Sequence, residues 1–118
     1  MQTNPPPGFS DIPRDRLAAL PFFRLNAAEH AVIQMLMLDV FSRPNDGHDY
    51  TCTCSREDLA AMLSPTYARH AVYGALENLR AKGLVTLGVP FALTPDWPSL
   101  LPAKYQERIA NFLNPRRN

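Results

Sequence analysis

Two cysteines and three histidines are the side chains of this sequence best suited to metal binding or nucleophilic chemistry. Cys52 and Cys54 lie two residues apart, so on a strand they would share one face, and His48 or His70 could complete a metal site with them. Structural zinc sites take four ligands, usually at paired spacings that this chain lacks. We therefore predict no metal site and interpret the cysteines as small apolar residues of a buried strand face.

The same residues form no recognisable catalytic set. A dyad of Cys52 or Cys54 with His48 lacks an orienting carboxylate and an oxyanion-forming loop at a matching spacing. The sequence also lacks a phosphate-cradling glycine loop and a helical pair of histidines four residues apart. We therefore expect neither an enzyme nor a bound cofactor.

Length and composition favour one small domain. The 118 residues, 46% of them hydrophobic, suffice for a single core. The longest apolar segment, residues 31–41, contains Gln34 and Asp39 and is shorter than the roughly 20 residues that span a bilayer. No secretory signal begins the sequence, and two closely spaced cysteines form no disulfide framework. We expect a cytoplasmic protein that does not enter a membrane.

Charge gives no sign of a strongly basic protein. Twelve Lys and Arg residues against eleven Asp and Glu residues leave a net charge of +1. Binding to a nucleic acid would therefore depend on a local patch and not on the field of the whole molecule.

Turn and cap residues divide the chain into elements. We predict a flexible proline-rich tail over residues 1–10, one domain over residues 11–113 and a basic tail over residues 114–118. A short first helix has Pro13 in its first turn and Leu17 and Leu20 facing inward. A second helix begins after Asn26, with Glu29 completing a capping box. The predicted core residues of this helix are Val32, Ile33, Leu36, Met37, Val40 and Phe41.

The second half alternates short helices and strands. After a turn at residues 43–49 we predict a short strand at 50–54 and a helix capped by Ser55. A further helix over residues 67–82 ends at Gly83 as a left-handed cap. Two short strands then flank residues 88–90. In the last predicted helix, an apolar stripe faces inward: Tyr105, Ile109 and Phe112 or Leu113. This stripe either folds back on the core or meets a second copy of the chain. We favour the second copy.

This order of elements is that of a winged helix-turn-helix, and the motifs agree with it. "SREDLAAML", a turn, "AVYGALENLRAKGLV" and the hairpin resemble the pattern of that DNA-binding superfamily over roughly residues 24–95. The segments "LNAAEHAVIQMLMLDV" and "NDGHDY" and the strand before Ser55 are most similar to replication-initiator-like and regulator-like proteins of phages, plasmids and mobile elements. The chain departs from the pattern in the long linker "SPTYARH" and in Ala71, where Thr is common.

The resemblance implies a mainly α protein with a small β-hairpin, a winged helix with extra terminal helices. It implies that helix 67–82 is the recognition helix of a sequence-specific binder of double-stranded DNA, a transcription regulator or replication accessory factor. The protein would be a homodimer joined through its terminal helices, which reads a palindromic site. Spacing from the core stripe puts the candidate DNA-binding residues on the outer side of that helix: Thr66, Tyr67, Arg69, His70, Tyr73, Gly74 and Glu77.

Each candidate has a chemical reason and a plain alternative. Arg69 can donate to a guanine edge or to phosphate, and His70 and Tyr73 can donate to phosphate or a base. Exposed side chains of this kind are often only solvated, and Tyr73 could instead pack on the preceding helix. Gly74 is more informative, because glycine inside a helix costs about 1 kcal/mol relative to alanine. Close approach by DNA or by a protein would explain it.

A different function is a winged-helix protein-interaction module, an inhibitor or adaptor that binds a host complex. The predicted wing is apolar, with Val89, Pro90 and Phe91 near its tip and no Lys or Arg. Basic residues that could hold phosphate lie near the chain ends instead: Arg14, Arg16, Arg116 and Arg117. The apolar wing and the near-neutral charge favour the interaction module, whereas the helix pattern favours DNA binding.

Overall fold

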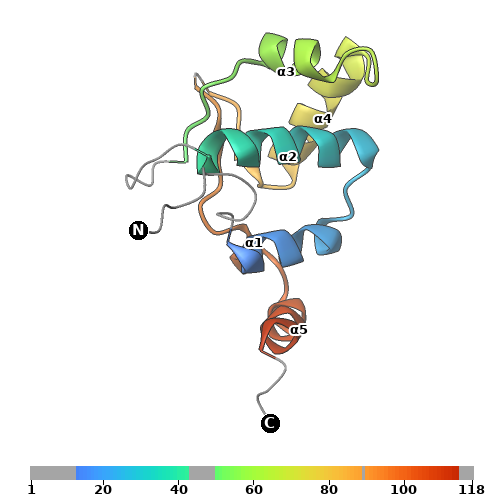
Figure 1. Ribbon diagram of the computed structural model, residues 1–118. Coiled ribbons are helices and arrows are strands. Elements are labelled where there is room, and N and C mark those ends of the chain that lie inside the picture. Colours follow the sequence, from blue (N-terminus) through green and yellow to red (C-terminus); the bar gives the residue numbers. More distant parts are fainter. Residues whose placement is uncertain (1–12, 43–49, 89, 115–118) are drawn as a thin grey trace, which may run out of the picture.

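The computed structural model describes residues 13–42, 50–88 and 90–114. They form a mainly helical fold with one small antiparallel sheet, as predicted (Figure 1). The elements in chain order are α1 (Arg14–Ala19), η2 (Leu20–Phe23), α2 (Ala27–Phe41), α3 (Arg56–Leu63), α4 (Arg69–Ala81), β1 (Val85–Thr86), β2 (Ala92–Leu93), η3 (Trp97–Leu100) and α5 (Ala103–Leu113). In Figure 1, α2 crosses the middle of the molecule, with α3 above it and α1 and α5 below it.

Helix α2 is the centre of the core, as its apolar spacing predicts. The Asn26 side chain accepts from the Glu29 backbone N–H at 2.8 Å, and the Glu29 carboxylate accepts from the Asn26 N–H at 3.1 Å. The predicted capping box is therefore confirmed. Five of the six predicted core residues of this helix are buried, and Phe41 is half-buried at its end. Packing against α4 covers much of this apolar surface.

Glu29 has a second role that its place in the capping box does not reveal. Its side chain is 3% exposed and accepts from Lys82 Nζ at 3.0 Å and from Asn78 Nδ2 at 2.8 Å. Burial acts to raise the pKa of Glu29, but these hydrogen bonds and that of Asn26 outweigh burial and lower the pKa. The ionised carboxylate therefore joins the start of α2 to the end of α4.

Helix α3 is held at its start by a second capping box, in which Ser55 and Asp58 bond to each other's backbone N–H. The strand predicted at residues 50–54 is wrong. These residues make only one isolated bridge, in which Thr51 lies opposite Ala92. Just beyond the bridge, this segment bonds to the carboxylate of Asp39 and not to a neighbouring strand. That carboxylate accepts from the Thr53 backbone N–H and hydroxyl, both at 2.6 Å, and so ties the segment to α2.

Helix α4 begins at Arg69, two residues later than predicted. Its N-cap is Ala68, which has extended backbone and no side chain to cap the helix, so Tyr67 remains in the connection from α3. The predicted end is confirmed, since Gly83 has φ +84°. The predicted hairpin is also confirmed, but each strand is only two residues long, with Val85 opposite Leu93 and Thr86 opposite Ala92.

Trp97 of η3 is fully buried and joins this segment to α1. Its indole N–H donates to the Arg16 carbonyl at 2.9 Å, while Arg16 Nε donates to the Pro95 carbonyl at 2.8 Å. Helix α5 packs on α1, and the Tyr105 ring stacks on Phe22 with centroids 4.8 Å apart. The part of the predicted stripe formed by Tyr105, Ile109 and Leu113 thus faces its own chain.

Two details of the end helices differ from the sequence prediction. Pro13 is the N-cap of α1 and does not lie in its first turn. Leu17 is 36% exposed and does not face inward. Of the two alternatives Phe112 and Leu113, it is Leu113 that packs inward, whereas Phe112 is 76% exposed. Leu17 and Phe112 lie on helices that cover the core with only one side, which leaves their outer sides to solvent. The predicted tails and the turn at 43–49 fall outside the described residues, except for Asn114.

None of the helices in the described part of the chain has both the length and the apolar content needed to cross a bilayer.

We predict that Glu29→Ala lowers the free energy of unfolding by about 1–3 kcal/mol, because the hydrogen bonds of its carboxylate with Asn26, Asn78 and Lys82 are lost. The measurement is urea denaturation at pH 7. Glu107→Ala, on the exposed side of α5, is the matched control and should change little. Equal effects of the two substitutions would contradict the role of Glu29.

The same carboxylate predicts a pH dependence. Its folded-state pKa lies below the ordinary value of 4.5, so its contribution is fully present above that pH and is lost as the pH falls through the lower folded-state value. The stability difference between the wild type and Glu29→Ala should therefore shrink in denaturation curves taken at pH 7, 4 and 3. A difference that stays constant would show that ionisation of Glu29 does not stabilise the fold.

Candidate functional site

The predicted site residues lie together along α4 and the connection before it. Arg69, His70, Tyr73, Gly74 and Glu77 are on α4, whereas Thr66 and Tyr67 precede it. All are exposed except Tyr67 and Tyr73, which are half-buried and pack against the core cluster. The structure therefore brings the seven residues into one region but leaves five of them at the surface.

Two of these side chains have partners within the chain. The Arg56 guanidinium of α3 lies 5.0 Å from the centre of the Tyr73 ring, so Tyr73 packs towards α3, the alternative raised by the sequence. Glu77 accepts from Arg80 at 2.8 and 3.1 Å. Arg69 and His70 are the first two residues of α4 and are exposed. They are the side chains of this helix best placed to meet a partner.

Gly74 has open space where a side chain would be. A Cβ atom built on it meets nothing within 4 Å, apart from its own helix and chain neighbours. Packing inside this protein therefore does not require glycine at this position. The cost to the helix remains consistent with close approach by an external partner.

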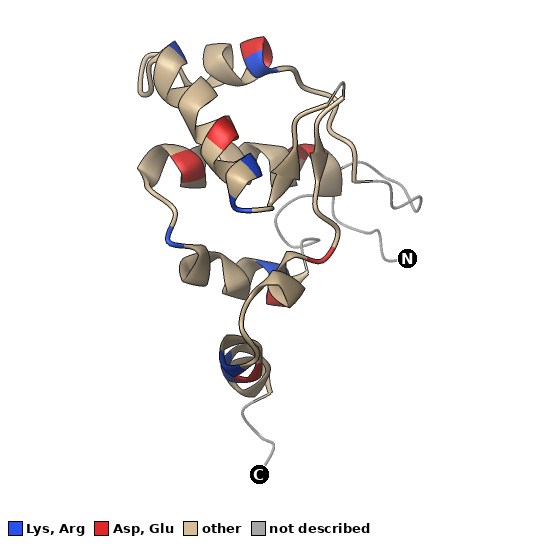
Figure 2. Cartoon of the chain, turned by 180° about the vertical axis from the view of Figure 1, so that it is seen from behind, with Lys and Arg blue, Asp and Glu red and all other residues tan. Residues whose placement is uncertain are grey.

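Charges of both signs are interspersed over this side of the molecule (Figure 2). Helix α3 carries Arg56, Glu57 and Asp58 in its first turn, and α4 carries Arg69, Glu77 and Arg80. The region is therefore not a broad basic surface. Any attraction of an anion here would come from single Arg side chains.

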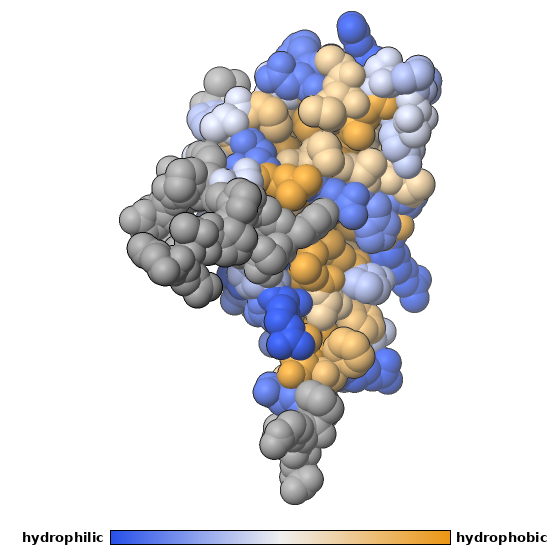
Figure 3. Space-filling model, viewed as in Figure 1, coloured by the Kyte–Doolittle hydropathy of each residue, from blue (hydrophilic) through white to orange (hydrophobic). Residues whose placement is uncertain are grey.

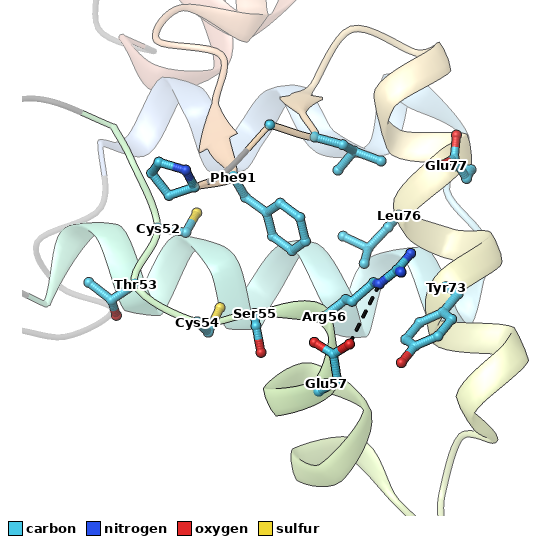
Figure 4. Close-up of a pocket in the computed structure, with 13 residues that line it drawn as sticks. Cys52, Thr53, Cys54, Ser55, Arg56, Glu57, Tyr73, Leu76, Glu77 and Phe91 are labelled. Carbon is cyan, nitrogen blue, oxygen red and sulfur yellow. Dashed lines mark ion pairs between the residues drawn. The ribbon is translucent and has the colours of Figure 1, made fainter.

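A pocket of about 640 Å³ lies beside α4, between the start of α3 and the hairpin (Figure 4). Its apolar lining includes Leu76, Leu87, Phe91 and the two cysteines. Figure 4 shows the Phe91 ring pointing into the space between Cys52 and Leu76. Polar side chains border the pocket, among them Arg56, Glu57, Tyr73 and Glu77. Tyr73 and Glu77 thus belong both to the predicted surface and to the pocket.

Sequence reasoning missed this pocket and the part that Arg56 plays in it. Its lining comes from residues 52–57, from Tyr73, Leu76 and Glu77 of α4, and from Leu87, Gly88, Pro90 and Phe91, and only folding brings these segments together. The one sequence signal was the absence of Lys and Arg from residues 85–93. The lack of cations in this segment agrees with the hairpin forming the apolar side of the pocket.

The cysteines do not form a reactive centre. Cys52 is 3% exposed. Desolvation, together with the charge of Asp39, raises the pKa of the half-buried Cys54 to about 11, so its thiol is neutral near pH 7. Within the described residues, no group of three or more His, Cys, Asp or Glu side chains could hold a metal ion, while His48 lies outside them. A neutral thiol is a poor nucleophile and a poor metal ligand.

Comparisons with known proteins find no relative of this chain. No protein family model, no curated protein and no solved structure matches it. Any function given to the chain is therefore a proposal from its residues and their geometry.

We predict opposite effects of one substitution at two glycines. Gly74→Ala should raise the free energy of unfolding by up to about 1 kcal/mol, since alanine is the better helix former and its methyl group has room. Gly83→Ala should lower it by about 1–2 kcal/mol, because φ +84° strains an L residue. Urea denaturation of both variants gives the comparison. Destabilisation by Gly74→Ala would show a packing role inside the fold.

We also predict slow alkylation of Cys54 in the folded protein. A pKa of about 11 in place of 9.0 leaves about 100-fold less thiolate near pH 7, and the iodoacetamide rate should fall in proportion. The control is the same reaction in urea, where the ordinary rate should return. Fragmentation of the tryptic peptide 25–56, which contains both cysteines, assigns the modified residue by mass spectrometry. Rapid labelling of Cys54 at pH 7 would contradict the raised pKa of its thiol.

Proposed function

We propose that this chain is a winged helix-turn-helix protein that binds double-stranded DNA in a sequence-specific manner through α4, as a transcription regulator or replication accessory factor. The observation that supports it best is the sequence of packed elements. Helix α3 packs on α4, α4 leads directly into the hairpin of β1 and β2, and the outer side of α4 is left exposed. A recognition helix needs this exposure to enter the major groove.

The start of α4 has the side chains that base reading requires. Recognition helices contact base edges mainly with their N-terminal residues. Arg69 and His70 hold those positions, and a guanidinium can donate two hydrogen bonds to a guanine edge. Gly74 lies on the next turn, where the absence of a side chain lets the helix backbone come close to DNA.

Phosphate contacts in this proposal are few. The hairpin supplies no cation, so it cannot hold the backbone as a basic wing would. Arg56 is 59% exposed at the start of α3, but to hold a phosphate beside the groove it would have to give up its contacts with Tyr73 and Glu57. Because each neutralised phosphate adds to the salt dependence, we expect a shallow slope of log K against log salt.

The proposed homodimer would use surface that α5 and its neighbours leave uncovered. Tyr105 and Ile109 are covered by their own chain, but Phe112 is 76% exposed and Leu100 49% exposed. Figure 3 shows apolar side chains at the surface over α1 and α5. Sedimentation at tens of micromolar tests this contact, and a strict monomer would exclude it.

The protein-interaction module stays the second candidate because of one observation. The pocket between α4 and the hairpin is apolar inside and bordered by charges of both signs, whereas a DNA-binding groove is usually basic. An inhibitor or adaptor would use this side of α4 against a protein.

We predict that Arg69→Ala weakens DNA binding by about 1–3 kcal/mol and relaxes specificity at one base position, if Arg69 reads a base. Fluorescence polarisation with DNA selected from a random library, at two salt concentrations, gives the measurement. Because Arg69 is exposed and unpaired among the described residues, the melting temperature should change little.

Arg108→Ala on α5 is the matched control, since it removes an exposed arginine far along the chain from α4. It should leave affinity unchanged. If the wild type selects no DNA sequence, α4 is not a recognition helix. If both variants bind alike, Arg69 lies outside the DNA contact. Either result favours the protein-interaction module.

A further inference from the structure

The pocket beside α4 has the dimensions and lining of a site for a small organic molecule. About 640 Å³ lies within the range of ligand pockets, which are mostly apolar with a few placed polar groups. Leu76 is 2% exposed and lies at the inner end, while Phe91 and Leu87 form the hairpin side. The neutral thiol of Cys54 adds a soft, uncharged part of the wall.

Carboxylates outnumber cations around this pocket. Glu57 and Glu77 line it, and their side chains are 66% and 61% exposed. Two further carboxylates lie behind the wall, and both raise the pKa of Cys54 through their charge: Asp39 and Asp58. Two cations, Arg56 and Arg80, partly balance these four carboxylates. The charges of these six side chains, counted among the described residues, sum to −2, which favours a positive occupant.

Arg56, the one cation among the described residues that line the pocket, is already engaged. Arg56 lies over the Tyr73 ring at 5.0 Å and 3.8 Å from a Glu57 oxygen (Figure 4). An arriving anion would have to compete with both contacts. An arriving cation meets the exposed sides of Glu57 and Glu77, which their Arg partners leave 66% and 61% exposed, and the face of Phe91, which attracts positive charge through its π electrons.

We propose that the pocket formed by the start of α3, α4 and the hairpin binds an amphipathic organic cation, with its apolar rings against Phe91 and Leu76 and its positive charge near Glu57 and Glu77. This site does not depend on DNA binding, and it persists if the proposed function is wrong. The charge of the ligand is its distinguishing property, since the apolar lining alone would accept either sign.

Two ions of the same shape and opposite charge give the test. Tetraphenylphosphonium should bind to the full-length protein and shift the amide signals of residues 52–57 and 73–77 in ¹H–¹⁵N NMR spectra. Tetraphenylborate should bind at least tenfold more weakly. Stronger binding of the borate, or no binding of either ion, would overturn the proposal.

Variants locate the charge and the apolar contact. Glu57→Gln and Glu77→Gln change exposed side chains, so the fold is kept, and each should weaken phosphonium binding by about twofold to fivefold, the range for an exposed charge pair. Phe91→Ala should weaken binding of both ions. Glu107→Gln on α5 is the matched control and should have no effect. Unchanged phosphonium affinity in both pocket carboxylate variants would place the ion elsewhere and overturn the assignment.

Discussion

The fold depends on one buried carboxylate that joins two helices far apart in the sequence. Glu29 begins α2, and Lys82 and Asn78 end α4, so the bonds of 3.0 and 2.8 Å set where α4 crosses α2. Apolar packing between these helices is non-directional and would tolerate some sliding. A buried ionised group does not allow such sliding, because it must keep its hydrogen-bond partners. The exposed side of α4 and the hairpin after it take their positions from this contact.

Local signals in the sequence predicted the elements well where one short segment contains the whole interaction. The capping box of Asn26 and Glu29, the cap at Ser55 and the left-handed Gly83 each involve neighbours along the chain. The apolar spacing of α2 likewise predicts its buried side. The start of α4 was misplaced by two residues because Ala68 provides no cap signal.

What the sequence could not predict lies in contacts between distant segments. Nothing near Asp39 indicates that it bonds to Thr53, a contact that accompanies the reduction of the expected strand to a single bridge. For the candidate site, the helical spacing of apolar residues predicted which side chains lie on α4. The pocket was not, because three segments separated by up to 39 positions, from Cys52 to Phe91, contribute its lining.

The surface of α4 therefore has two chemically different parts. Its first turn, with Arg69 and His70, is polar and exposed, as groove recognition needs. Its later turns border an apolar pocket whose carboxylates would repel phosphate. Tyr73 and Glu77 belong to both, so a molecule held in the pocket would lie next to any DNA held by α4.

Trp97 has a further consequence for anyone working with the protein in solution. It is the only tryptophan in the sequence, it is fully buried, and its N–H bonds to Arg16 near the chain's other end. An indole in such surroundings emits at shorter wavelengths than one in water. The intrinsic fluorescence of this chain is therefore a single-site signal for the docking of α1 on η3, and it reports on folding from a place remote in sequence from α4.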